Sequence, residues 1–223
     1  MIQSSKIVGN GEFFMSRVEI KDFAKKLFKG CEWEKWLVVL ILGIINSEIQ
    51  FFGYGLLNYK GSFILSIVIT GILWLINVGG AVYMTNLVDK RDVEPKMLIS
   101  KFSFEIFATK CLEFLIVLLY SLLFVIPGII KKYQFAMVNY LLADKRYDSK
   151  KSKEILDLSG MIMNGHKMDL FLLQLSFIGW HILSVFTLGI LEIWILPWQK
   201  ISETKFILEI KDKFENEQAE LFN

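Results

Sequence analysis

The stretch GSFILSIVITGILWLINVGGAVYMTNLV (residues 61–88) decides the fold, because it holds no charged residue. About 20 apolar residues in a helix are enough to cross the roughly 30 Å hydrocarbon core of a bilayer. A second apolar run, at 170–191, is interrupted only by Gln174, His181 and a few hydroxyl side chains, and a third covers 114–130. The sequence therefore predicts a helical protein whose main solvent is the bilayer.

The composition supports a membrane protein. Mean hydropathy is +0.46 and 54% of the residues are hydrophobic, which is more than a soluble domain of this size needs for its core. The two cysteines, Cys31 and Cys111, lie in or beside apolar segments and far apart in the chain. We interpret them as small buried hydrophobic residues rather than as a disulfide.

The apolar runs and the breaks between them predict an all-α, polytopic membrane protein with about six transmembrane helices. The predicted spans cover residues 36–57, 63–88, 104–126, 129–143, 168–186 and 190–210. We expect the third span to end at Pro127-Gly128, because proline removes a backbone donor from a helix. Residues 16–212 then form a single membrane domain between a flexible N-terminal tail, 1–15, and a polar C-terminal tail, 213–223.

Two further segments predict amphipathic helices on the membrane surface. Between residues 17 and 30, apolar residues recur at helical spacing with lysines between them, as in helices that lie on an anionic leaflet. Residues 152–167 show a similar pattern. Lys and Arg gather before the first span, after the last one and in the loops at 89–101 and 144–167. The positive-inside rule therefore predicts that both termini and these two loops are cytoplasmic.

Several strings of the sequence carry a resemblance to a known family. They are Glu19-Ile20-Lys21, LLFVIPGIIK (122–131), YLLAD (140–144), NGHK (164–167), LSFIGW (175–180) and TLGI (187–190). Together they resemble the family catalogued as domain of unknown function 975, integral membrane proteins mostly of Gram-positive bacteria. The resemblance extends over about 17–210 and is more specific in its second half.

This resemblance implies one multi-helix domain in a bacterial cell membrane, and it brings no activity, catalytic residue or cofactor. It also implies that residues 1–14 precede the natural initiator, Met15. Glu192 departs from the family's pattern, which has an apolar residue just after the last turn. A role for Glu192 would therefore be particular to this chain.

Residues able to carry catalysis are scarce in the sequence. It has two histidines and lacks the H-E-x-x-H, G-x-S-x-G and glycine-rich phosphate-loop motifs, so we predict no catalytic, metal or cofactor site and no enzyme. Gly79-Gly80 is interpreted as a place where helices pack closely. Lys110 and Glu113 are three residues apart, where they can neutralise each other, and we interpret them as an anchor near the start of a span.

Polar side chains inside the predicted spans are costly there and are often functional. Gln174 and His181 are seven residues apart and therefore share one face of their helix. They predict either an interhelical hydrogen bond or a polar, proton-sensitive lining, since histidine titrates near neutral pH. Glu48 and Asn77 could complete such a lining. Glu48 and Glu192, both expected in the outer half of the membrane, could meet a cationic substrate or peptide.

The sequence favours a non-enzymatic accessory protein or subunit of an envelope or export system, because it shows no soluble domain and no nucleotide-binding motif to power transport. Immunity against a membrane-active peptide is an alternative that suits the small size and the acidic residues of the outer half. A small transporter or channel is another. The expected partners are the lipid bilayer, other membrane proteins or a transported peptide, and not nucleic acid, because the membrane already explains the lysines.

Overall fold

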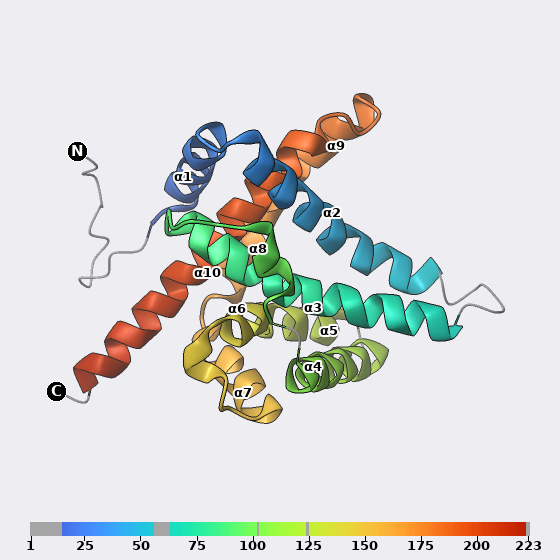
Figure 1. The fold of residues 1–223 in the computed structure, drawn as a ribbon, viewed down its shortest axis with the longest axis vertical. Helices are drawn as coiled ribbons and strands as arrows, with labels where there is room; N and C mark the ends of the chain where they lie inside the picture. Colours follow the sequence, from blue (N-terminus) through green and yellow to red (C-terminus); the bar gives the residue numbers. More distant parts are fainter. Residues whose placement is uncertain (1–14, 56–62, 102, 124, 222–223) are drawn as a thin grey trace.

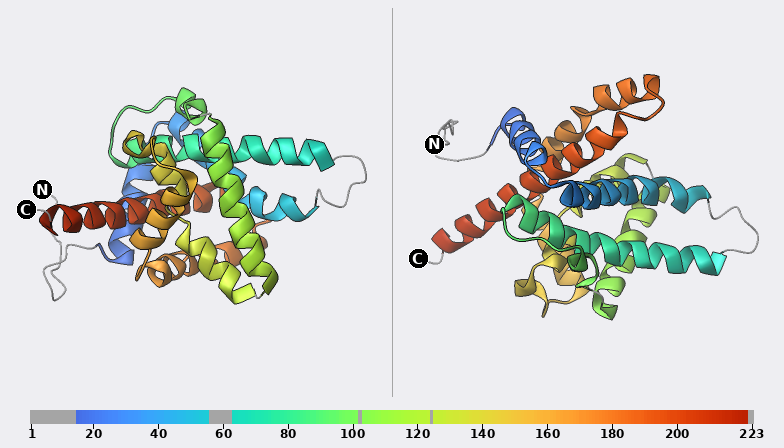
Figure 2. Two further views of the ribbon diagram at one scale, coloured as in Figure 1. Left: turned by 90° about the horizontal axis from the view of Figure 1, so that it is seen from below. Right: turned by 45° about the horizontal axis from the view of Figure 1, so that its top comes forward.

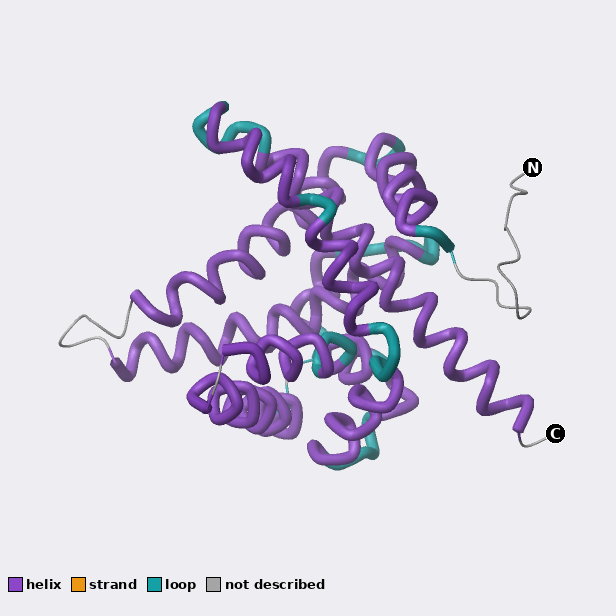
Figure 3. Tube along the Cα trace, turned by 180° about the vertical axis from the view of Figure 1, so that it is seen from behind, coloured by secondary structure: helices purple, strands orange, loops and turns teal. Residues whose placement is uncertain are grey.

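The computed structural model describes residues 15–55, 63–101, 103–123 and 125–221, and among them the side chains of 15–44, 71–101, 103–120 and 126–220. All regular elements in these residues are helices, so the prediction of an all-α fold is confirmed (Figures 1 and 3). In chain order they are α1 (Arg17–Lys29), α2 (Trp33–Gly55), α3 (Phe63–Val88), the 3-10 turn η2 (Pro95–Ile99), α4 (Phe104–Leu123), α5 (Val125–Gln134), α6 (Val138–Ala143), the 3-10 turn η3 (Lys145–Tyr147), α7 (Ser152–Ile162), α8 (Lys167–Leu175), α9 (Ile178–Phe186) and α10 (Glu192–Leu221).

The first helix, α1, begins with a capping box. The Ser16 hydroxyl accepts from the backbone N–H of Glu19 at 3.3 Å, and the Glu19 carboxylate accepts from the backbone N–H of Ser16 at 2.8 Å. This pairing satisfies two donors that an open helix end would leave unpaired. The helix packs against α10, and Ile20 and Ala24 are fully buried. Protein therefore covers part of the apolar face that was predicted to enter lipid.

The long helix α3 contacts α2, η2, α4, α6 and α10 and so lies at the centre of the fold (Figure 1). Two glycines allow its close neighbours to approach. A Cβ at Gly79 would lie 1.9 Å from the Leu98 carbonyl oxygen in η2, and a Cβ at Gly80 would lie 2.6 Å from a methyl of Leu42 in α2. The interpretation of Gly79-Gly80 as a packing site is confirmed.

The fourth predicted span, 129–143, is not one helix. The structure divides it into α5, which ends at Gln134, and α6, which begins at Val138. The break is stabilised from α7, where the Ser159 hydroxyl donates to the Gln134 carbonyl oxygen at 2.8 Å. A carbonyl at the helix end is thus satisfied by a side chain. After the break, α6 packs against α3 and α7.

Two other boundaries also differ from the prediction. The helix α4 ends at Leu123, and Pro127 lies in the first turn of α5, where a missing N–H is tolerated. Residues 213–221, predicted as a polar tail, continue α10 as helix. Their charges support this, because Lys213 and Glu217 pair at 3.9 Å with the i,i+4 spacing that stabilises exposed helices.

The fifth predicted span, 168–186, is interrupted at residues 176–177, between α8 and α9. The Lys21 ammonium of α1 donates to the Ser176 carbonyl oxygen at 3.2 Å and to the Ser176 hydroxyl at 3.0 Å. It also lies 4.1 Å from the centre of the Phe177 ring, while the Trp198 indole donates to the Lys21 carbonyl oxygen at 3.0 Å. A cation at the end of α8 satisfies its free carbonyl and complements the helix dipole.

Two helical stretches are long and apolar enough to cross a membrane, judged by length and composition over the described residues. They are Gly71–Val88 in α3 and Lys167–Phe186 across α8 and α9. Protein buries 56% of the first stretch but only 22% of the second. The second stretch therefore presents much of its apolar surface to the outside of the protein.

Large apolar side chains are exposed on several of the described helices, and two groups of them stand out. One is α4, with Phe114, Leu115, Leu118 and Leu119. The other is the hairpin formed by α9 and the start of α10, residues 178–194, which projects from the body of the protein (Figure 2). At its tip Phe186 and Leu188 are 80% and 94% exposed. Contiguous apolar surface of this kind is unfavourable in water and marks contact with a membrane or with another protein.

Candidate functional site

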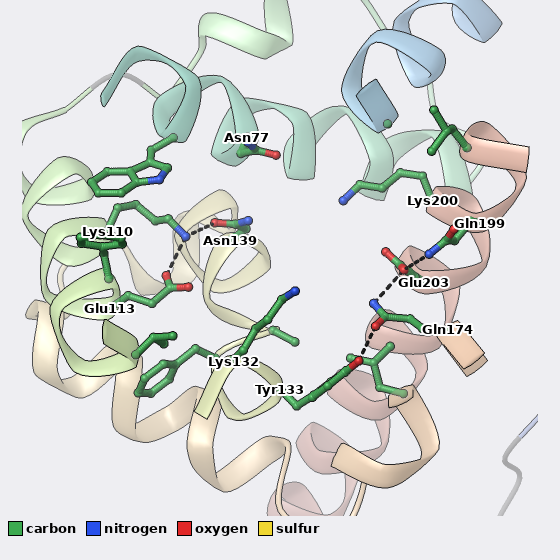
Figure 4. A pocket seen from close by; sticks show the side chains of 18 of the residues that line it. Asn77, Lys110, Glu113, Lys132, Tyr133, Asn139, Gln174, Gln199, Lys200 and Glu203 are labelled. Carbon is green, nitrogen blue, oxygen red and sulfur yellow. Dashed lines mark hydrogen bonds and ion pairs between the residues drawn. The ribbon is translucent and has the colours of Figure 1, made fainter. Parts of the chain in front are cut away.

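A polar cavity of about 740 Å³ lies between α3, α4, α5, α8 and α10 (Figure 4). Within the described residues, its polar lining is formed by Asn77, Lys110, Glu113, Lys132, Tyr133, Asn139, Gln174, His181, Gln199, Lys200 and Glu203. Trp74, Phe114 and Leu196 contribute apolar parts of the wall. A cavity of this size is typical of sites that hold small molecules.

One wall of the cavity is an ion pair. The Lys110 ammonium on α4 donates to the Glu113 carboxylate at 2.6 Å and to the Asn139 amide oxygen on α6 at 3.0 Å. Only 8% of Lys110 is exposed. These side chains therefore belong to the cavity wall, which differs from the interpretation of Lys110 and Glu113 as an anchor near the start of a span.

The opposite wall is a chain of hydrogen bonds. The Tyr133 hydroxyl on α5 donates to Gln174 Oε1 on α8 at 2.6 Å, and Gln174 Nε2 donates to Glu203 Oε1 on α10 at 2.8 Å. Gln199 Nε2 donates to the same carboxylate oxygen at 3.0 Å. The amide oxygen of Gln199 lies 2.8 Å from His181 Nε2 on α9. The side chains of four helices thus form one continuous polar wall.

The chain of hydrogen bonds continues from His181 to Glu192 in the α9–α10 hairpin. His181 Nδ1 lies 3.0 Å and 3.2 Å from the two carboxylate oxygens of Glu192. The two side chains are 33% and 31% exposed, in a hairpin whose other exposed side chains are mostly apolar. Glu192 therefore contacts His181 but does not itself line the cavity.

Two further lysines give the cavity an excess of positive charge. Lys132 on α5 and Lys200 on α10 extend their amino groups toward its interior (Figure 4). With Lys110 they make three cations against two carboxylates, Glu113 and Glu203, so the lining has a formal charge of +1 when His181 is neutral. This balance favours a ligand that carries a negative charge.

Three of the five side chains predicted to line a polar path meet at this cavity, namely Asn77, Gln174 and His181. Asn77 is 8% exposed, and its amide donates to a backbone carbonyl one turn earlier in α3 at 3.1 Å. Glu192 joins them through its contact with His181. Glu48 lies in α2, but its side chain is outside the described residues.

Comparison with known proteins adds one finding. Residues 108–213 match the family described as protein of unknown function DUF975. The match supports membership of this family. The match covers the second half of the resemblance drawn from the sequence, and it includes both walls described above but not Asn77. No curated protein and no solved structure matches the chain.

Sequence reasoning missed much of the polar wall within the DUF975 region. Gln199 and Glu203 follow the predicted Glu192 at spacings of seven and four residues, which places them on one face of a helix with it and could have pointed to them. Tyr133 and Asn139 gave no such signal, because only the break between α5 and α6 brings them to one cavity. Among the described residues, no group of three or more His, Cys, Asp or Glu side chains is arranged to hold a metal ion.

Proposed function

We propose that the protein is an integral membrane protein whose cavity takes up a small polar solute, as in a small transporter or channel. The observation that carries this proposal is the cavity itself. Charged and amide side chains from several helices face one interior space, whereas the outer surface of α4 and of the α9–α10 hairpin is apolar. Membrane proteins place costly polar side chains in this way, around an interior path rather than toward lipid.

The proposed arrangement has about six helical segments in a bacterial cell membrane, with both ends of the chain on the cytoplasmic side. The basic loops support this orientation. The interruptions at α5–α6 and α8–α9, both next to the cavity, resemble the discontinuous helices that form binding sites in transporters. A cysteine at position 188 should react with a membrane-impermeant reagent outside intact cells, and one at position 150 should not. The reverse pattern would overturn the orientation.

The solute that fits the lining is a small anion or zwitterion, because three lysines outnumber two carboxylates. Purified protein in proteoliposomes should take up at least one of the labelled probes acetate, phosphate and glycine faster than protein-free vesicles do, and should not take up rubidium. An Asn139→Trp variant, which fills the cavity, should lose this uptake. Leu118→Trp, on the exposed face of α4, is the matched control. Equal uptake of every probe with and without protein would contradict the proposal.

A second candidate, an accessory protein that works through association, is favoured by the C-terminal part of α10. This part projects from the body of the protein, and residues 216–220 are exposed (Figure 1). In-membrane crosslinking of the tagged protein, with and without residues 216–223, tests it. Recovery of an ATPase or permease only with the intact end would support this candidate. Self-crosslinks and lipid alone would favour the solute cavity.

A further inference from the structure

The hydrogen bonds around His181 fix the position of one of its protons. A carboxylate only accepts, so the amide nitrogens of Gln174 and Gln199 both face Glu203 Oε1. The oxygen of Gln199 is then the atom 2.8 Å from His181 Nε2. An amide oxygen also only accepts, so Nε2 must carry a proton.

The other ring nitrogen of His181 faces Glu192 and requires a second proton. A neutral imidazole that is protonated at Nε2 presents a lone pair at Nδ1. At 3.0 Å and 3.2 Å, that lone pair would face the two oxygens of an ionised carboxylate with no hydrogen between them. A proton on either the ring or the carboxyl group turns this repulsion into a hydrogen bond. In both cases the pair holds two protons and has no net charge.

The surroundings also favour a neutral pair. Within the described residues, His181 is the one group that forms an ion pair with Glu192. The other charged and titratable groups that line the cavity are Glu203 and Lys200 on α10, Lys132 and Tyr133 on α5, and Lys110 and Glu113 on α4, and Lys21 lies beside the start of α9. An uncompensated carboxylate in the apolar α9–α10 hairpin would be costly in a membrane.

We infer that His181 and Glu192 form a proton-binding site that is connected to the cavity through Gln199. When the second proton leaves, the Glu192 carboxylate faces the Nδ1 lone pair and the contact breaks. His181 is then free to turn away from Gln199, which alters one wall of the cavity. This site goes beyond the proposed solute uptake and is tested separately from it.

The test determines how many protons the His181–Glu192 pair holds when the protein is in lipid bilayers at pH 7. Nitrogen NMR of histidine-labelled protein reports whether each ring nitrogen of His181 carries a proton, and infrared spectroscopy reports a protonated carboxyl group. Two protonated ring nitrogens would support the inference. So would one protonated nitrogen together with a carboxyl band that Glu192→Gln removes. A single protonated nitrogen beside an ionised Glu192 would overturn it, whatever the uptake assays show.

Two variants make this test specific. His166→Gln removes the signals of the one other histidine and so assigns those of His181. In Glu192→Gln the new amide can donate to Nδ1, so His181 should become neutral with a proton on Nε2 alone. Doubly protonated His181 in that variant would show that Glu192 does not hold the second proton, and would also overturn the inference. If one of these variants fails to fold, His166→Asn or Glu192→Ala takes its place.

Discussion

Two polar clusters bind α10 to the rest of the protein, and they are built in opposite ways. Near its C-terminal end, Asp144, Arg146, Lys211 and Glu215 form what we call the ionic cluster. Arg146 contacts Asp144 at 2.6 Å and Glu215 at 2.8 Å, and Lys211 also contacts Asp144. In the first half of α10, by contrast, neutral amides separate the charged groups that face the cavity.

The electrostatics of the ionic cluster show that its charges stabilise one another. Burial disfavours the charge of Asp144, but hydrogen bonds from Arg146 and Lys211 outweigh burial and hold the pKa of that carboxyl well below its ordinary value. Burial and the neighbouring Glu215 raise the pKa of Tyr147 to about 12. Each member of this cluster meets an opposite charge, whereas the cavity has an excess of cations. The comparison indicates that the ionic cluster stabilises the fold, and it supports the proposal that the cavity holds a ligand.

The largest effect is expected from breaking the ionic cluster. Asp144→Ala should lower the free energy of unfolding by about 2 kcal/mol, because two cations lose a shared, charged acceptor. Thermal unfolding in detergent measures this. Glu217→Ala is the matched control on the same helix, since Glu217 is 56% exposed and its pair with Lys213 at 3.9 Å contributes about 0.3 kcal/mol. Equal losses in the two variants would contradict a special role for the ionic cluster.

The stabilisation by Asp144 should depend on pH in a defined direction. Its pKa is lowered in the folded protein, so the contribution is fully present above the unfolded-state pKa of about 3.9 and is lost as the pH falls below it. The difference in unfolding temperature between the wild type and Asp144→Asn should stay constant from pH 7 to 5 and shrink below about pH 4. An unfolding-temperature difference that grew as the pH fell would contradict a lowered pKa of Asp144 in the folded protein.

A smaller effect on stability is expected in the cavity. Glu203→Gln keeps an oxygen that can accept from Gln174 and Gln199, so stability should change by less than about 1 kcal/mol. Uptake of an anionic probe should nevertheless rise about tenfold, equivalent to about 1.4 kcal/mol, because the formal charge of the lining increases from +1 to +2. Unfolding and uptake are measured on the same preparations. A large loss of stability with normal uptake would make the cavity wall structural, like the ionic cluster.

The sequence predicted the helices better than it predicted the side-chain contacts between them. Uncharged runs and helical spacing identified α3 with its observed bounds and found α1 from the alternation of apolar residues and lysines. The breaks at 135–137 and 176–177 were missed because side chains from distant helices stabilise them. Ser159 satisfies the end of α5, and Lys21 satisfies the end of α8. Neither contact can be read from local sequence.

The candidate site was predicted only in part, and the reason is the same. Gln174 and His181 share a helical face, and their spacing alone brought them to attention. Glu203 and Tyr133 complete the same wall from other helices, and their contacts depend on how α5, α8 and α10 cross. Lys110 and Glu113 were recognised as a pair by spacing, but the sequence did not show that Asn139 and the cavity lie beside them.

If the protein takes up a solute in a membrane as proposed, water must reach this polar cavity. After Cys31 and Cys111 are replaced by serine, a single cysteine is placed at Asn139 or at Leu118, and a charged thiol reagent is added to proteoliposomes. The account predicts rapid labelling at position 139, in the cavity wall, and protection at position 118, on the exposed apolar face of α4. Labelling at 118 with protection at 139 would contradict it.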